Sequence, residues 1–411
     1  MQNPQSPGIP RLWTGSFITL LCISSLTSIA MNMQMVTLPL YIVQTGGGPS
    51  SAGMMMGAFT IAALLFRPYF GRLVDRLGGK LMLVAGTAVF AVISLAYSVL
   101  PWVWALLLVR FIHGVGFSAS STASGTMLAQ VVPPRRLMEG IGLAGLAHTL
   151  AVAVGPGIGL FFARQLNNYT LLYVITALLA MAAIAVAWRL REPEGSRPAA
   201  AEPIAPRRNN LIERSALPTS AVMFFIAMPQ SSIITFLPAY GLEQGVGLIG
   251  LFFTFSAISM VAARVFCGKI SDKHGPGIVI IPGFLLAVAA LAWLPFIASL
   301  DGFIAAGVLH GLGFGTVQPI LNALTMRRCP SERRGAGNAT FFLFIDGGYA
   351  AGSILIGLLL SYTSYAVMYM CCAGLIVLAL GLYIYLLGSK RERIRERNLS
   401  QEWIQNSEGA D

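Results

Sequence analysis

An acidic residue lies in the middle of a long apolar segment of this chain. Asp346 follows the run Phe341-Phe342-Leu343-Phe344-Ile345. At helical spacing, Phe342, Asp346 and Tyr349 share one face of a helix. An ionisable group in such a segment is costly and is a functional site by default. The sequence therefore predicts that Asp346 loads and releases protons; the alternative is a carboxylate held by donors on a neighbouring helix.

Basic and neutral polar groups occur in other apolar segments. Arg110 and His113 lie on one stripe of a predicted helix, which we expect to face a central cavity. A neutral imidazole can relay protons or bind a ligand, so His148 is a second candidate for proton coupling beside Arg110 and Asp346. Hydrogen bonds between helices are the alternative for every one of these groups. The predicted substrate contacts are Asn32, Gln34, Thr37, Arg110, His113, His148, Gln230, Phe342, Asp346 and Tyr349.

The composition predicts that membrane-spanning helices position these groups. Hydrophobic residues make up 56% of the 411 residues and charged residues only 10%, far below the roughly 25% of soluble domains. Apolar segments of about 20 residues, the length that crosses a bilayer as a helix, follow one another along the chain. Twelve spans are predicted: 15–41, 51–72, 81–100, 102–129, 140–164, 170–189, 217–240, 247–268, 277–298, 301–326, 336–360 and 363–387.

The net charge of +11 is distributed by side of the membrane. Nearly all Lys and Arg residues between the spans fall on one side, whereas Arg164 is alone on the other. The positive-inside rule then places both termini in the cytoplasm, in a cell or inner membrane. The basic excess thus reflects topology and contact with the lipid bilayer, and nucleic acid is not an expected partner.

The chain has five cysteines without the spacing of a metal site, and it has no nucleotide-binding loop, so neither a metal nor a cofactor is predicted.

The polar breaks divide the chain into five parts. The predicted parts are a cytoplasmic segment over 1–13, a six-helix bundle over 14–190, a cytoplasmic linker over 191–216, a second six-helix bundle over 217–388 and a cytoplasmic tail over 389–411.

The two predicted bundles are copies of one unit. Arg67, Gly71 and Asp75 recur 197 positions later as Arg264, Gly268 and Asp272. The same offset relates His113 to His310 and a run of prolines, arginines and glycines after each of them. Repeats in the same direction indicate two halves rotated about the bilayer normal, with a substrate path between them.

A loop motif with its echo resembles the signature of the major facilitator superfamily. The chain reads Gly71-Arg72-Leu73-Val74-Asp75-Arg76 after the second span, and a second copy begins at Gly268 after the eighth span. The resemblance implies an all-α integral membrane protein with twelve transmembrane helices in two pseudo-symmetric six-helix bundles. It also implies a gate, whose predicted residues are Arg67, Gly71, Asp75, Arg76, Gly155, Pro156, Arg264, Gly268 and Asp272.

Two further motifs resemble those of drug/proton antiporters within that superfamily. Arg110-Phe111-Ile112-His113-Gly114 is similar to the fourth-helix pattern, with His113 where Gln is usual, and Gly155-Pro156-Gly157 is similar to the fifth-helix signature. The sequence is therefore interpreted as a monomeric secondary transporter that exports a small amphiphilic or zwitterionic compound in exchange for protons. The alternatives are a proton symporter for a sugar or organic acid, a flippase for a lipid-linked compound, and a sensor or scaffold. An enzyme is not expected, and no catalytic residue is proposed.

Overall fold

Apolar segments that cross a bilayer fold as helices because only a helix satisfies its backbone hydrogen bonds within one segment. The computed structural model describes residues 12–133, 136–190, 212–330 and 333–387. Within these residues, twelve helices are long and apolar enough to cross a membrane, which confirms the predicted number. The same residues contain no strand, as the all-α prediction requires. The N-terminal segment, the tail and most of the predicted linker lie outside the described residues.

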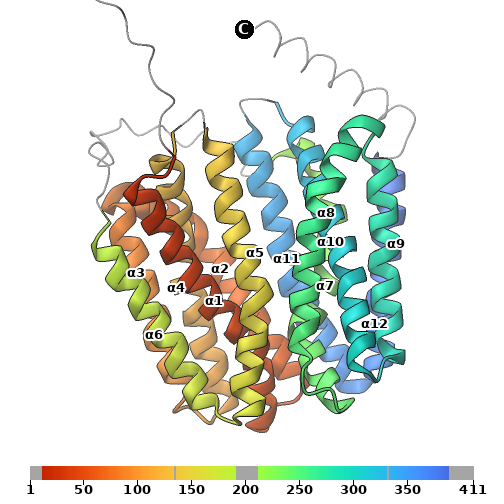
Figure 1. Ribbon diagram of the computed structural model, residues 1–411, viewed down its shortest axis with the longest axis horizontal. Coiled ribbons are helices and arrows are strands. Elements are labelled where there is room, and N and C mark those ends of the chain that lie inside the picture. Colours follow the sequence, from red (N-terminus) through yellow and green to blue (C-terminus); the bar gives the residue numbers. More distant parts are fainter. Residues whose placement is uncertain (1–11, 134–135, 191–211, 331–332, 388–411) are drawn as a thin grey trace, which may run out of the picture.

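The helices fall into two groups that lie side by side (Figure 1). The first half consists of α1 (Gly15–Gln44), α2 (Pro49–Leu77), α3 (Gly79–Tyr97), α4 (Val103–Val131), α5 (Leu137–Leu160) and α6 (Tyr169–Trp188). The second half consists of α7 (Leu217–Glu243), α8 (Gly250–His274), α9 (Gly277–Trp293), α10 (Leu300–Arg328), α11 (Arg334–Tyr362) and α12 (Tyr365–Leu387). The described residues also contain three short elements, the π-helix η2 (Phe161–Gln165) and the 3-10 helices η3 (Arg214–Ala216) and η4 (Leu294–Phe296).

The two halves use the same helix contacts. In the first half α2 packs on α4, α1 on α5, and α3 on both α4 and α6; in the second half α8 packs on α10, α7 on α11, and α9 on both α10 and α12. The seam between the halves is formed by α2 against α11, α5 against α8, and α1 against α7. Each half is therefore one bundle with its own packing, and the seam separates two similar bodies.

Close helix approach at glycines follows the 197-residue repeat. A Cβ at Gly114 would collide with the carbonyl oxygen of Phe59, and a Cβ at Gly311 would collide with that of Ser256, which is the equivalent position. Small residues allow such approach in membrane helices, where packing rather than the hydrophobic effect holds helices together. Residues that repeat in the sequence therefore make equivalent helix contacts in the two halves.

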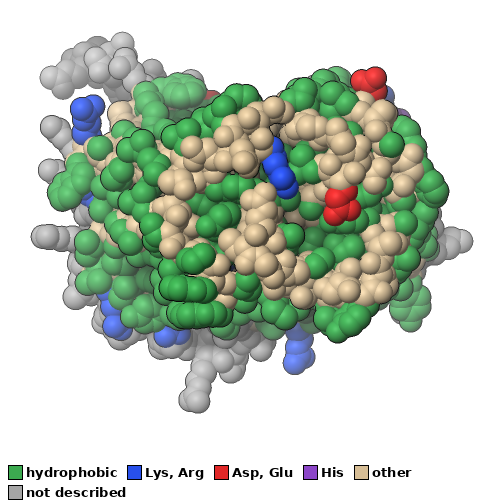
Figure 2. Space-filling view, turned by 90° about the horizontal axis from the view of Figure 1, so that it is seen from below, with side chains coloured by type: hydrophobic (Ala, Val, Ile, Leu, Met, Phe, Trp, Pro, Cys, Tyr) green, Lys and Arg blue, Asp and Glu red, His purple; other side chains and the backbone are tan. Residues whose placement is uncertain are grey.

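We name the two faces of the molecule by the linker. The end of α6 and the start of α7 lie on the linker face, with the start of α1 and the end of α12, as helices in alternating directions require (Figure 1). The opposite face is covered mostly by hydrophobic and uncharged side chains (Figure 2). The small number of charged side chains on the opposite face agrees with the charge asymmetry of the sequence.

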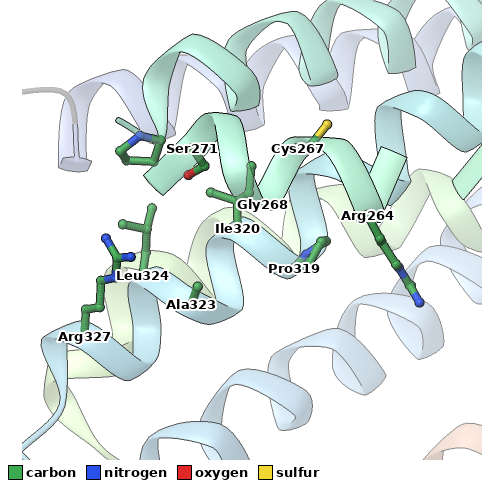
Figure 3. A pocket seen from close by; sticks show the side chains of 10 residues that line it. Arg264, Cys267, Gly268, Ser271, Pro319, Ile320, Ala323, Leu324 and Arg327 are labelled. Carbon is green, nitrogen blue, oxygen red and sulfur yellow. The ribbon is translucent and has the colours of Figure 1, made fainter. Parts of the chain in front are cut away.

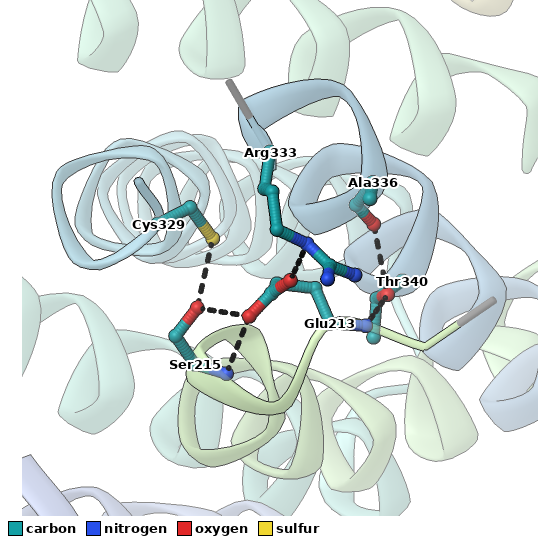
Figure 4. Close-up of polar contacts among 6 residues, drawn as sticks. All are labelled: Glu213, Ser215, Cys329, Arg333, Ala336 and Thr340. Carbon is teal, nitrogen blue, oxygen red and sulfur yellow. Dashed lines mark hydrogen bonds and ion pairs between the residues drawn. The ribbon is translucent and has the colours of Figure 1, made fainter. Parts of the chain in front are cut away.

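A polar cluster fastens the start of the second half to α11 (Figure 4). The Glu213 carboxylate accepts hydrogen bonds from the backbone N–H of Ser215 (3.2 Å) and its hydroxyl (2.7 Å), and it lies 2.5 Å from Arg333 Nε. The backbone N–H of Glu213 donates to Thr340 Oγ1 at 2.9 Å. The hydrogen bonds from Ser215, and then the nearby Arg333 guanidinium, hold the pKa of Glu213 below its ordinary value. We call these four residues the Glu213 cluster.

Candidate functional site

An ion pair crosses the seam between the halves. Arg67 Nη1 on α2 lies 2.9 Å from Asp346 Oδ2 on α11. Both side chains are partly exposed, so the pair lies at the edge of the packed seam. A guanidinium and a carboxylate at this distance form a charge-assisted hydrogen bond. The sequence identified Asp346 as an intramembrane acid but grouped Arg67 with the gate, so the pairing is new.

The pseudo-symmetric position on the other side of the seam carries a weaker contact. Arg264 Nη1 on α8 lies 3.4 Å from Thr149 Oγ1 on α5, and Arg264 Nη2 lies 3.4 Å from the sulfur of Met260. Arg264 is exposed, and so is His148, the residue before Thr149. His148 Nδ1 lies 3.5 Å from Ser28 Oγ on α1. The sequence analysis did not single out Thr149.

Glycines close the seam toward the opposite face. A Cβ at Gly53 would collide with the backbone of Ser353, and a Cβ at Gly250 would lie 2.8 Å from the Cα of Gly157. Hydrogen bonds from Ser50 to Ser361 Oγ (3.1 Å) and from Thr254 Oγ1 to the carbonyl of Ala153 (2.8 Å) join the halves in the same region. The contacts therefore extend from the opposite face to the level of Asp346 and Thr149.

The structure corrects the predicted position of Arg110. Its side chain is fully buried within the first half and does not face a cavity. Its guanidinium lies 4.2 Å from the ring centre of Phe59, and its Nη1 lies 3.2 Å from His113 Nδ1. The sulfur atoms of Met35 and Met56 lie 3.3 and 3.8 Å from Nη2. A charge in this setting is stabilised by a ring face and soft acceptors, so its place is in the packing of α1, α2 and α4.

Several other predicted substrate contacts are buried within the first half, where they bind neighbouring helices or, for Thr37, the backbone of their own helix. Gln34 is buried and donates to Ser94 Oγ and Thr176 Oγ1, both at 2.7 Å. Thr37 is buried and donates to the carbonyl of Met33. His113, also buried, lies 3.2 Å from the hydroxyl of Tyr97. These groups hold one half together.

The remaining predicted contacts lie nearer the seam. Gln230 Oε1 on α7 lies 2.7 Å from His310 Nε2, and His310 Nδ1 lies 2.7 Å from Ser256 Oγ. Asn32 is half-buried and donates to the carbonyl of Ser28 within its own helix. On α11, Phe342 is exposed and Tyr349 is half-buried on the face that carries Asp346, as the helical spacing predicts.

The gate motif lies at the linker face. A Cβ at Gly71 or at Gly268 would meet nothing within 4 Å, so neither glycine packs against a neighbour in this conformation. Asp75 and Arg76 are exposed, and Asp75 forms no ion pair with any residue that the structure describes. The backbone of Asp272 lies in the last turn of α8, but its side chain lies outside the described part.

The fifth-helix glycines serve two different neighbours. A Cβ at Gly155 would lie 2.7 Å from Asn32 Cβ, so Gly155 allows α5 to approach α1 within the same half. Gly157, two residues later, faces Gly250 of α8 across the seam. Pro156 lies between them inside α5, which ends in the π-helix η2. A proline and a π-helical turn both bend a helix, so this end of α5 is adapted to its two partners.

These features define a class of protein: a membrane transporter built of two six-helix bundles, with charged groups at the seam. The Major Facilitator Superfamily model matches the chain over residues 20–348 and again over 221–406. The chain belongs to the Major Facilitator Superfamily and is a transporter rather than an enzyme.

Known proteins similar to this chain are transporters. The staphylopine export protein of Staphylococcus aureus is 23% identical over 357 residues, which cover 83% of this chain and 88% of that protein. A multi-drug resistance efflux pump PmrA homolog of Lactococcus lactis is 26% identical over 356 residues, covering 82% and 86%.

Solved structures support the fold. The nucleoside transporter NupG is 15% identical with a TM-score of 0.74, covering 92% of this chain and all of that one. A bacterial homolog of the human lysosomal transporter Spinster, in an inward-facing and unoccupied conformation, is 12% identical with a TM-score of 0.75, covering 93% and 97%. At these identities the likeness concerns the fold alone.

Proposed function

We propose that the chain is a proton-coupled antiporter that exports a small amphiphilic or zwitterionic compound by alternating access. The observation that carries this proposal is the ion pair between Arg67 and Asp346 across the seam. Rocking of the halves changes the distance between α2 and α11, so the strength of this pair differs between the two end states. A proton on Asp346 removes its charge and weakens the pair, which couples protonation to the movement.

The conformation described fits one stage of such a cycle. The halves are joined toward the opposite face, whereas at the linker face Gly71 and Gly268 meet no neighbour and Asp75 forms no ion pair with a described residue. We place the linker face in the cytoplasm because the basic residues gather there. An ionised Asp346 paired with Arg67 then belongs to a state that has released its proton inward and can accept substrate.

We assign the other predicted residues roles that support this step. His148 lies exposed at the seam and is the second candidate for proton transfer. Asp75, Arg76 and Asp272 would latch the linker face when the halves close there. Arg110, which the sequence assigned to proton coupling, would act through the packing of the first half. The transporter works as a monomer in the cell or inner membrane, with both termini in the cytoplasm.

The two export proteins among the relatives support the direction of transport. The regions of these two proteins that align with this chain cover 83% and 82% of its length, at identities of 23% and 26%. Uptake by proton symport uses the same fold, and it predicts the opposite sign of coupling. A pH gradient imposed on oriented vesicles separates the two, because an exporter moves substrate against the proton flow and a symporter moves it with the flow.

Asp346→Asn tests the proton-coupling role. In proteoliposomes with an imposed pH gradient, the wild type should drive transport of the fluorescent zwitterionic amphiphile rhodamine B, and the variant should lose the gradient-driven part because its side chain cannot ionise. Gel filtration in detergent checks that the variant is folded. Asp301→Asn, which changes an exposed acid in the first turn of α10, is the matched control and should transport normally. Gradient-driven flux at the wild-type rate in Asp346→Asn would remove this residue from the mechanism.

A further inference from the structure

The two sides of the seam carry the same arginine but different partners. Arg67 and Arg264 are 197 positions apart, and so are Thr149 and Asp346. The contact of Arg67 with Asp346 and the contact of Arg264 with Thr149 are therefore pseudo-symmetric copies of each other. In the second copy, a neutral hydroxyl replaces the carboxylate.

Arg264 consequently has a charge without a counter-ion in the described part of the chain. No described carboxylate lies within ion-pair distance of it. Arg264 lies inside the candidate span of α8, which runs from Gly250 to Gly268. An arginine does not lose its proton in a protein, and an unpaired charge within a span is costly. A carboxylate of a bound compound would supply the counter-ion that the described residues do not provide.

The surroundings of Arg264 suit an anionic ligand. The side chain is exposed, and it is one of the residues that line a hollow of about 170 Å³ between α8 and α10 (Figure 3). Its guanidinium contacts Thr149 of α5 across the seam. On the facing helix, the Thr149 hydroxyl accepts from Arg264 and donates to the carbonyl of Gly145, so it orients the guanidinium, and the exposed His148 ring offers a further donor. The planar guanidinium binds a carboxylate through two parallel hydrogen bonds.

We propose that Arg264, with Thr149 and His148, binds a carboxylate of the transported compound. This inference rests on the proposed function, because it names the chemical class of the substrate of the same seam. The missing acid at position 149 leaves the site open: an acid there would pair with Arg264, as Asp346 pairs with Arg67, and would compete with a carboxylate of the substrate. The substrate is therefore an acid or a zwitterion rather than a simple cation.

Equilibrium binding to the purified full-length chain in detergent tests this proposal without any gradient. The probes are aromatic N-acyl amino acids and their primary amides, beginning with N-benzoylphenylalanine and its amide. The wild type should bind each acid at least tenfold more tightly than the matched amide, measured by isothermal titration calorimetry. Arg264→Gln should abolish this preference, and Arg264→Lys should retain part of it. Arg189→Gln removes an exposed cation at the end of α6 and should preserve the preference.

Thr149→Asp tests the same site while keeping the arginine. The new carboxylate should pair with Arg264, raise the apparent Tm of the ligand-free protein and remove the preference for acids. Failure of every acid to bind, equal binding of acids and amides, or an unchanged preference in both Arg264→Gln and Thr149→Asp would overturn the proposal. Asp346→Asn should keep the preference even where it loses gradient-driven flux, so a failure of proton coupling and a failure of this site are distinguishable.

Discussion

At the scale of single residues, the position of a charge in the sequence did not reveal its partner. The apolar surroundings of Asp346 and Arg110 identified both as exceptional, because charges in membrane spans need a reason. Their partners come from distant segments: Arg67 for Asp346, and Phe59 with His113 for Arg110. Helical periodicity gives the face of one helix, but it cannot give the helix that this face meets.

One signal in the sequence could have located the seam contacts. The repeat equates position 346 with position 149, and position 67 with position 264. When two segments of one copy have equivalent residues in the other copy, they can make equivalent contacts across the axis that relates the two copies. Applied to charged residues, this reasoning predicts an ion pair on one side and an arginine without an acid on the other.

His113 provides a test of the buried arginine. His113 Nδ1 lies close to both Arg110 and the Tyr97 hydroxyl, which are donors, so this nitrogen acts as their acceptor. His113→Gln supplies a carbonyl oxygen in its place and should retain most of the stability. His113→Leu leaves a buried guanidinium short of an acceptor and should cost about 1–3 kcal/mol. Thermal unfolding in detergent, followed by tryptophan fluorescence, measures the difference, and equal Tm values for the two variants would contradict this account.

At the scale of elements, the sequence predicted the number of helices, but the gate motif, which was expected in a loop, lies in the last turns of α2 and α8, and the chain turns only after it. Gly78 and Gly275 occupy equivalent positions after α2 and α8, and both adopt positive φ, at 91° and 90°. This backbone conformation favours glycine, so the motif requires glycine at the turn. Several helices extend beyond the apolar segments, as with α2, which runs from Pro49 to Leu77 rather than over 51–72. Hydropathy detects the part in the bilayer, whereas backbone hydrogen bonding continues into the polar flanks.

The Glu213 cluster is an element-scale contact that the sequence did not suggest. Arg333 is the repeat partner of Arg136, but the two arginines bind different acids. Arg136 pairs with Glu139 of its own helix start, whereas Arg333 pairs with Glu213, which precedes α7. The second copy therefore uses the same arginine to join two segments that are far apart in the sequence.

A pH titration tests this joint. Because the folded-state pKa of Glu213 is lowered, its contribution to stability is present at neutral pH and is lost as the pH falls through that lowered value, below the ordinary value of about 4.3. Glu213→Gln should lower the apparent Tm at neutral pH by roughly 2–4 °C, the shift that about 1 kcal/mol produces in a large domain. The difference from wild type should shrink on acidification.

Glu139→Gln is the matched control for the joint. Its pair with Arg136 is exposed and spans only three residues, so its loss should change the Tm much less. Equal Tm shifts in the two variants, or a Glu213→Gln shift that does not depend on pH, would show that the cluster does not join α7 to α11.

At the scale of the whole molecule, the sequence predicts two halves but not how they are placed. Both end states of a rocking transporter have the same sequence, the same helices and the same packing within each half. What differs is the seam, where the energies of the two states must be nearly balanced for the movement to occur. The seam is closed by glycine contacts toward the opposite face, and at the linker face Gly71 and Gly268 of the gate motif meet no neighbour.

Gly53 tests whether that closure is reversible. A Cβ at this position would collide with the backbone of Ser353, so Gly53→Ala should strain the closed seam by about 1–3 kcal/mol. If the halves rock, this strain shifts the population roughly five- to hundredfold toward a state that is open on the opposite face, since 1.4 kcal/mol corresponds to a factor of ten. Spin labels are attached at Gln44 and Thr363 in a variant without the native cysteines. Double electron–electron resonance should then report a longer distance between the two labels when Gly53→Ala is added. Gly125→Ala is the matched control, because a Cβ there meets nothing within 4 Å. An unchanged distance distribution in a folded Gly53→Ala protein would mean that the backbone near Gly53 shifts locally without opening this face. Alternating access would then need a different pair of helices as its gate.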